Sequence, residues 1–323
     1  MKRLDWKSVL TLRHVSQRLR NFIDSSNLSI FENLDLHGIE ISARDEGIDL
    51  YFSSHKGSHR IQYFLEKNFS TARKFENREE ALVEASSPMD LAMIDLNIML
   101  RFQRSKFNTF SLIMSFESEE IKDSEIAQLL PAMLSNTLKS FTTKNWRLKA
   151  EKLVFYVFDQ SQMSQSLPFF DSGTLKEIGI GCSIKNSNFE MDEIVKTEQW
   201  KSAEEFDSDL PDFSENLENF SHFRKVEANL KTIFAEDLDL LKKAYLLNPN
   251  FIWFRANYKE LKKTEIISTF WGLPFNRYPE DEYFFRIPNT KEIFHVRNNK
   301  EYKFIWFSKI MNYEVPNGAI VQD

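Results

Sequence analysis

The sequence predicts an α/β fold, a leucine-rich-repeat-like solenoid of short strands and helices with a C-terminal β-hairpin. Strand and helix patterns alternate along the chain, and Gly and Pro are scarce, with 8 and 9 of 323 residues. Strand starts recur roughly every 20–45 residues, which is the range of strand-plus-helix repeats. The spacing is irregular and there is no strict leucine–asparagine ladder, so a compact α/β sandwich is the alternative.

The individual elements follow from local patterns. Mixtures of β-branched and aromatic residues predict strands at 110–116, 152–158, 175–180, 223–228 and 251–255. Apolar residues at helical spacing predict helices at 90–103, 118–138 and 236–247. The segments 292–297 and 301–307 predict the hairpin, since Asn298 and Asn299 between them tolerate the positive φ of a tight turn.

The first 24 residues form a basic segment that predicts one amphipathic helix. Ser8 is a candidate cap at its start, and residues 25–27 end it. Arginine and glutamine occupy the opposite face from the apolar residues. The apolar face consists of Val9, Leu12, Val15, Leu19, Phe22 and Ile23.

Bulk composition excludes several classes of protein. A net charge of −6 argues against a nucleic-acid binder, which needs a basic field. No apolar run has the length of a membrane span, and the start lacks the apolar stretch of a signal peptide. We therefore expect no membrane partner and a cytoplasmic location, with the nucleus as a second compartment. A single cysteine, Cys182, precludes an internal disulfide.

Motifs for catalysis and cofactor binding are missing from the sequence. Gly179 and Gly181 lack the third glycine of a phosphate-binding loop, and no Gly-x-Ser-x-Gly motif occurs. His55 and His59 are spaced like metal ligands, but Gly57 between them disfavours a helix and predicts an exposed loop. We expect a protein that is not an enzyme and has no cofactor or metal.

An acidic run between residues 204 and 218 predicts a solvated loop, which could also steer a basic partner toward the protein. Its spacing fails as a calcium loop, because Asp212 stands where a glycine is needed. Its members are Glu204, Glu205, Asp207, Asp209, Asp212, Glu215 and Glu218.

Two stretches resemble a known family. Residues 4–24, beginning Leu-Asp-Trp and ending Asn-Phe-Ile-Asp, resemble the second half of an F-box. Residues 167–178, with their Gly-Thr-Leu step, and residues 191–202, with Glu-Gln-Trp-Lys, resemble the centre of a Fog-two-homology (FTH) domain. The sequence is therefore similar to the nematode F-box proteins that carry an FTH domain (the F-box A-type family).

The resemblance implies a partial F-box at residues 1–27 and an FTH domain at residues 28–323. It implies a substrate-recognition subunit of a Skp–cullin–F-box ubiquitin ligase, with a Skp-type adaptor, a cullin and an unknown target protein as partners. The implied adaptor-binding residues are Leu4, Leu10, Leu12, Val15, Leu19 and Phe22. No target-binding residue is implied. The alternatives are a ligase-independent scaffold or neutralising binder, with the N-terminal helix acting as the cap of a repeat array.

Overall fold

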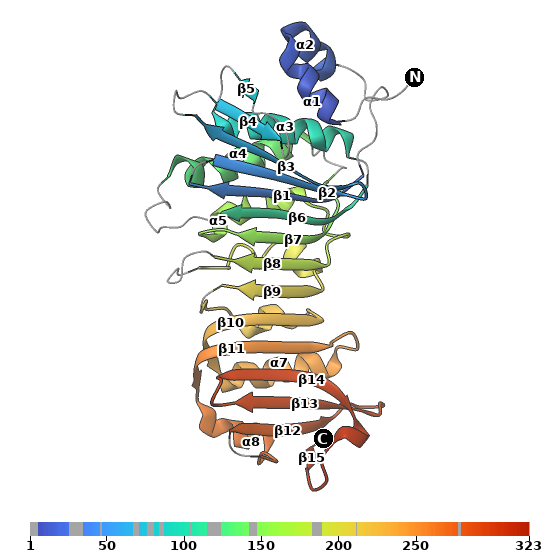
Figure 1. Ribbon diagram of the computed structural model, residues 1–323. Coiled ribbons are helices and arrows are strands. Elements are labelled where there is room, and N and C mark those ends of the chain that lie inside the picture. The colour runs from blue at the N-terminus through green and yellow to red at the C-terminus, as the bar shows by residue number, and fades with distance from the viewer. Residues whose placement is uncertain are drawn as a thin grey trace. The chain divides into compact units, whose positions relative to one another are not determined.

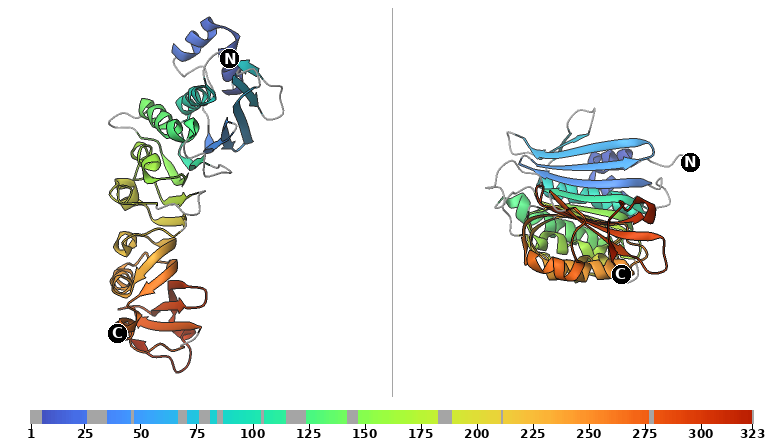
Figure 2. Two further views of the ribbon diagram at one scale, coloured as in Figure 1. Left: turned by 90° about the vertical axis from the view of Figure 1, so that its left-hand side faces the viewer. Right: turned by 90° about the horizontal axis from the view of Figure 1, so that it is seen from below.

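The computed structural model divides into two compact units, residues 1–175 and 176–323 (Figure 1). It describes residues 6–25, 35–45, 47–66, 71–75, 81–83, 87–103, 105–114, 124–141, 147–182, 189–210, 212–276 and 279–322. The domain boundary predicted near residue 28 lies outside these ranges. Both units are mixed α/β, which confirms the class predicted from the sequence, and Figure 2 shows helices along one face of the strands in each.

The N-terminal segment forms two helices, so the prediction of one continuous helix was wrong. Helix α1 covers Trp6–Val15 and α2 covers Gln17–Ser25. Ser16 separates them, and its Oγ accepts a hydrogen bond from the backbone N–H of Leu19 at 3.2 Å, as an N-cap side chain does. Ser8, the predicted cap, lies within α1.

The first unit contains an antiparallel meander that was not predicted from the sequence. Its strands are β1 (Leu36–Arg44), β2 (Gly47–Ser54), β3 (Gly57–Leu65), β4 (Thr71–Phe75) and β5 (Ala81–Val83). The two predicted strands of this unit are present as β6 (Phe107–Met114) and β7 (Ala150–Tyr156), which run parallel to β1. The strand order is β5-β4-β3-β2-β1-β6-β7.

Two long helices precede the parallel strands of this unit. Helix α3 (Pro88–Phe102) begins two residues before the predicted helix, because Ser87 and Asp90 form a capping box around Pro88. Helix α4 (Glu125–Phe141) lies between β6 and β7 in the chain. The short α5 (Gln160–Ser164) and the 3-10 helix η3 (Leu167–Phe169) follow β7.

The second unit begins with four parallel strands. These are β8 (Glu177–Gly181), β9 (Glu205–Asp209), β10 (Lys225–Phe234) and β11 (Trp253–Lys262). Their connections contain α6 (Glu198–Ser202), the 3-10 helix η4 (Leu217–Phe220) and α7 (Ala235–Leu247). The helix predicted at 236–247 is therefore confirmed as α7.

Antiparallel strands complete this unit in the order β11-β14-β13-β12, with β15 (Val321–Gln322) parallel to β12. Their bounds are Glu280–Arg286 for β12, Glu292–Asn299 for β13 and Phe304–Met311 for β14. Helix α8 (Ile267–Trp271) follows the 3-10 helix η5 (Thr264–Ile266), and a last 3-10 helix, η6, covers Asn312–Glu314.

The predicted C-terminal hairpin is confirmed, but its turn lies further along the chain. Strands β13 and β14 pair antiparallel from Asn299↔Phe304 outward. Asn299 ends β13, and its Oδ1 accepts hydrogen bonds from the backbone N–H groups of Glu301 and Tyr302. The positive φ is taken by Lys303, at 51°. The Asn299 side chain therefore holds this turn, while the left-handed backbone conformation is adopted by Lys303 and not by an asparagine.

Phenylalanine and tryptophan fill the core of the second unit. Trp200, which is 1% exposed, lies with its ring centroid 4.9 Å from those of Phe206 and Phe223. Tyr245 of α7 stacks on Phe251 at 4.1 Å. The Glu-Gln-Trp segment at residues 198–200 thus serves packing, as expected for an aromatic residue that buries a large apolar area. In the described part of the chain, no helix has the combination of length and apolar composition that a membrane span needs.

Candidate functional site

The structure places the family-implied adaptor residues in different environments. Leu10 is fully buried, Leu12 and Leu19 are half-buried, and Phe22 is 56% exposed. Leu4 and the side chain of Val15 lie outside what the structure describes. Among the four described side chains, Phe22 offers the largest accessible apolar surface.

The acidic run is only partly a loop, so the prediction needs correction for residues 205–209, whereas Asp212 and Glu215 lie in irregular backbone as predicted. Residues 205–209 form strand β9. Three of the acids make ion pairs within the unit: Glu204 with Arg224 at 2.7 Å, Glu205 with Lys225 at 2.8 Å, and Asp212 with Lys259 at 2.7 Å. These carboxylates are therefore partly neutralised, which reduces the charge available to steer a partner.

Among the described residues of the second unit, no helix covers one face of the sheet. Phe254 of β11 and Phe307 of β14 point toward α7, where both rings lie near Tyr245. Because side chains alternate along a strand, Trp253 and Trp306 point to the opposite face. Figures 1 and 2 show α7 behind the strands, so this open face is turned toward the viewer in Figure 1.

Aromatic and arginine side chains cluster on the open face. We call this set the aromatic–arginine face: Trp253, Arg255, Arg297, Phe304 and Trp306. All five are half-buried. Strand register places Trp306 of β14 opposite Arg255 on one side and Arg297 on the other. This cluster was not predictable from the sequence, because its members come from three strands whose pairing is not local.

The aromatic rings and the guanidinium groups contact one another. The Trp253 and Trp306 rings stack, with centroids 5.7 Å apart and planes at 22°. The Arg297 guanidinium lies 5.3 Å from the Trp306 ring centroid, and that of Arg255 lies 5.4 Å from the Phe304 ring. Cation–π contacts of this kind restrict the arginine side chains. The face is therefore partly organised before any partner binds.

Both arginines keep unused hydrogen-bonding capacity. The Nε atoms of Arg255 and Arg297 are buried and have no hydrogen-bond partner among the described residues. Arg255 Nη1 lies 3.5 Å from Glu227 Oε1, and Arg297 Nε lies 4.0 Å from Glu280 Oε1, so neither ion pair is tight. Because these Nε atoms are buried, a carboxylate or carbonyl group of a partner would bind the terminal nitrogens of the guanidinium groups, whose fork geometry suits such recognition.

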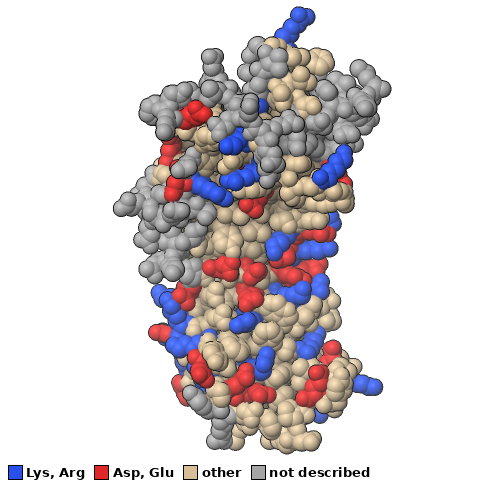
Figure 3. All heavy atoms as spheres, in the orientation of Figure 1, with Lys and Arg blue, Asp and Glu red and all other residues tan. Residues whose placement is uncertain are grey.

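An acidic zone borders the arginines. Strand register places Glu227 of β10 beside Arg255 and Asp207 of β9 beside Glu227. Asp207 and Asp209 are exposed. Figure 3, in the orientation of Figure 1, shows acidic and basic side chains interspersed over this side of the second unit. The open face therefore combines a tryptophan pair with charges of both signs.

Titratable groups elsewhere in this unit serve packing. Lys242 is 6% exposed, with its Nζ 3.1 Å from Asp239 and 4.1 Å from the Phe285 ring centroid. Burial lowers the pKa of Lys242, opposed by its hydrogen bond to Asp239. Burial, reinforced by the Asp281 charge, raises the pKa of Tyr258 to about 12. Tyr258 donates its hydroxyl proton to Asn298 at 2.8 Å, which gives it a structural role.

Comparison with protein families identifies one domain. Residues 131–272 match the family model of the FTH domain. This part of the chain is therefore similar to the FTH domain, which the Gly-Thr-Leu and Glu-Gln-Trp-Lys motifs predicted. The match runs from within α4 to just after α8, so it includes Trp253 and Arg255 but ends before Arg297 and Trp306. Comparison with curated proteins gave no match.

Proposed function

We propose that the protein is a substrate receptor that binds target proteins through the aromatic–arginine face and delivers them to a Skp–cullin–F-box ubiquitin ligase. In this role it performs no catalysis, because ubiquitin transfer belongs to other components of the ligase. The FTH domain and the F-box-like sequence at residues 4–24 support this assignment. The parallel strands of the second unit and their helical connections would act as leucine-rich-like repeats, which present strands on an extended face.

The observation that carries the proposal is the Trp253–Trp306 stack flanked by Arg255 and Arg297 on a face that α7 leaves uncovered. Tryptophan and arginine dominate the energetics of protein interfaces, where single residues contribute about 2 kcal/mol or more. Their preorganisation reduces the entropy lost when the side chains become fixed in a complex. A mixed-charge border favours correctly oriented encounters over non-specific ones.

A capture experiment tests the recognition half of the proposal. The tagged full chain and its Trp253→Ala/Trp306→Ala variant are used to isolate partners from cells under proteasome inhibition, followed by quantitative mass spectrometry. The matched control is Leu240→Ala/Leu247→Ala, which removes two α7 side chains that are 62% and 80% exposed. We expect target recovery to fall at least tenfold in the tryptophan variant and to persist in the control. Equal recovery from both variants would contradict the proposal.

Ligase coupling needs a separate test with purified components. We expect the full chain to bind a Skp-type adaptor and Phe22→Ala to weaken that binding at least tenfold. Leu65→Ala is the matched control, since Leu65 of β3 is 53% exposed, close to the 56% of Phe22. Adaptor binding that is absent from the wild type, or equally affected by both substitutions, would contradict the ligase assignment.

A ligase-independent scaffold or neutralising binder is the second candidate, and the burial of Leu10 favours it. A side chain with no exposed surface stabilises this chain and offers nothing to an adaptor unless α1 moves. Under this alternative, the tryptophan variant still loses its targets, but target abundance in cells does not depend on the proteasome.

A further inference from the structure

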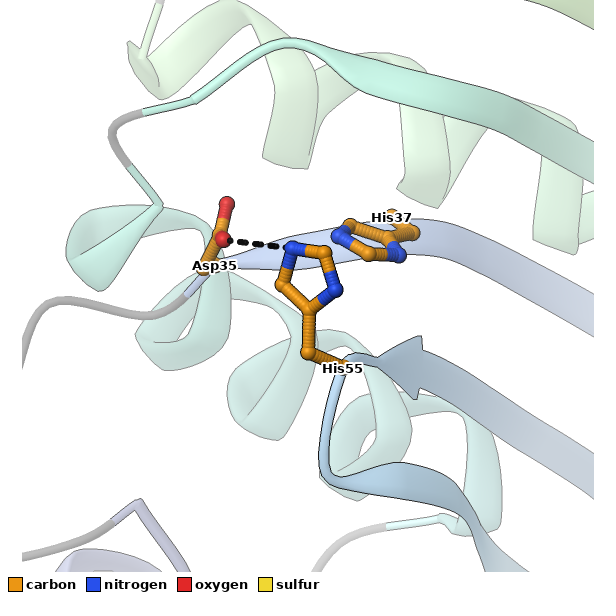
Figure 4. Close-up of side chains that lie close together, drawn as sticks. All are labelled: Asp35, His37 and His55. Atoms are coloured by element: carbon orange, nitrogen blue, oxygen red, sulfur yellow. Dashed lines mark ion pairs between the residues drawn. The ribbon is translucent and has the colours of Figure 1, made fainter.

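Asp35, His37 and His55 converge at one end of the β1–β2–β3 meander. Asp35 directly precedes β1, His37 lies near its start, and His55 lies in the β2–β3 turn (Figure 4). One ligand atom from each residue lies within 4.8 Å of the others. The two imidazole rings meet edge to face with centroids 3.8 Å apart, and His55 Nε2 lies 3.4 Å from Asp35 Oδ2. The pair singled out in the sequence, His55 and His59, is not the pair that meets.

A β-bulge orients His37 toward the other two residues. Leu36 pairs with Ser54 and Gly38 with Ser53, so His37 is an extra residue on β1. Bulges of this kind re-aim a side chain and are common beside functional sites. Without the bulge, each residue of β1 would have its own partner on β2, and His37 would not be an extra residue beside the β2–β3 turn.

Neighbouring side chains fix the backbone and the carboxylate of this cluster. Gln103, which is 6% exposed, accepts from the Leu36 N–H and donates to the Leu36 carbonyl, both at 3.0 Å. Ser105 Oγ donates to Asp35 Oδ1 at 2.6 Å. This bond leaves Oδ2 facing His55, and such outer partners commonly orient metal-ligating carboxylates.

The β2–β3 turn that carries His55 is held in a similar way. Ser54 Oγ accepts from the Lys56 N–H and donates to the Gly57 carbonyl, both at 3.2 Å. Gly57 adopts a φ of 115°, which residues with a side chain rarely take. The backbone next to His37 and next to His55 is thus held by contacts that do not involve the imidazole rings.

We propose that Asp35, His37 and His55 form a binding site for a divalent transition-metal ion of the zinc class. Two imidazoles and one carboxylate suit zinc, whereas Mg²⁺ and Ca²⁺ prefer sites made of oxygen alone. Ligand atoms around tetrahedral zinc are about 3.4 Å apart, so the trio closes by rotamer adjustments of about 1 Å. His55 and Asp35 are 74% and 57% exposed in their side chains, which leaves room for that movement.

Three protein ligands leave the fourth position of a tetrahedral zinc open, as in catalytic sites and in sites completed by a partner. Water or a side chain of a bound protein would occupy it. The site also ties the start of β1 to the β2–β3 turn, so metal binding should stabilise the meander. An ordinary His55–Asp35 ion pair would account for one of these contacts, but it would not require His37.

The test titrates the metal-free full chain with Zn²⁺ by calorimetry, and with Co²⁺ by absorption spectroscopy to report ligand geometry. We expect saturable binding that weakens at least tenfold in His37→Ala, His55→Ala and Asp35→Ala. His59→Ala, in the same hairpin, is the matched control and should bind as the wild type does. Zn²⁺ should raise the melting temperature and slow hydrogen exchange in the β2–β3 turn for the wild type and the control alone.

Several results would overturn the proposal. These are the absence of Zn²⁺ binding, binding that persists in all three trio variants, or equal binding of Mg²⁺. If Zn²⁺ binding is lost in Asp35→Ala and His55→Ala but is complete in His37→Ala, then His37 is not a ligand and the proposed three-residue site is wrong. Hydrogen exchange of the metal-free variants checks that each one retains the fold of the meander.

Discussion

Replacing Asp95 with leucine would break a buried ionic network that joins α3 to β3 and β4. Asp95 has no exposed surface, and its Oδ2 accepts hydrogen bonds from Arg73 at 2.9 Å and from the Tyr63 hydroxyl at 2.8 Å. Burial raises the pKa of Asp95 although Arg73 acts against it. Buried ion pairs of this kind generally add little net stability, because the cost of removing both charges from water offsets much of their attraction.

The magnitude of the loss follows from what the substitution leaves behind. Arg73 is 2% exposed, so Asp95→Leu creates an uncompensated buried cation, at a cost of about 3–5 kcal/mol. The double variant Arg73→Met/Asp95→Leu removes both charges and should recover most of that loss. Glu193→Ala, which breaks the exposed Lys196–Glu193 pair at 2.9 Å, should change stability little.

Hydrogen exchange measured by mass spectrometry on peptides from β3, β4 and α3 gives the opening free energy of this region. We expect the order wild type, double variant, single variant, from most to least protected. If the single variant stays within about 1 kcal/mol of the wild type, or if the double variant is as unstable as the single one, then the reasoning from uncompensated charge is wrong.

Three further substitutions test local features. Thr197→Ala removes the Oγ1 that accepts a hydrogen bond from the Trp200 N–H at 3.2 Å. It should lower the free energy of unfolding by about 1 kcal/mol, measured by urea unfolding followed by tryptophan fluorescence. No change in that free energy would contradict the capping role. Burial lowers the pKa of His222 below 6.5, so at acidic pH the unfolded state binds more protons than the folded state, and stability falls as the pH drops below 6.5. His222→Gln should reduce that fall, measured as denaturation midpoints from pH 7 to 5. An unaltered pH profile would refute this prediction. Gly47→Ala would drive a methyl group into the Tyr63 carbonyl and should lower the melting temperature clearly, whereas an unchanged temperature would disprove the tight approach of β2 to β3.

Elements with local signals were predictable from the sequence. Helix α3 was predictable because its apolar residues repeat at helical spacing, and the β13–β14 hairpin because two apolar strands are separated by a short polar turn. The meander was missed although the apolar residues Ile39, Ile41 and Ala43 alternate along β1 and are buried, a period-two signal that was available. Ser16 also carried a signal, because serine at an N-cap begins a second helix.

The candidate site was beyond sequence reasoning for a physical reason. Strand β11 was predicted, and alternation separates Trp253 from Phe254 within it. The neighbours of Trp253 on the open face depend on which strands pair and in what register. Trp306 reaches it only because β14 returns antiparallel beside β11, with Arg255 opposite Trp306. Similarly, His37 meets His55 through a bulge that local sequence does not specify.

Site-specific photo-crosslinking in cells tests most directly whether the aromatic–arginine face binds proteins. A photoreactive amino acid is introduced at Ser308, which register places opposite Trp253 on the open face, or at Leu240 on α7 as the control. Crosslinking at Ser308 is expected to trap proteins that the wild type also captures and whose abundance rises under proteasome inhibition. Adducts formed from Leu240 and not from Ser308 would contradict the assignment of the binding face.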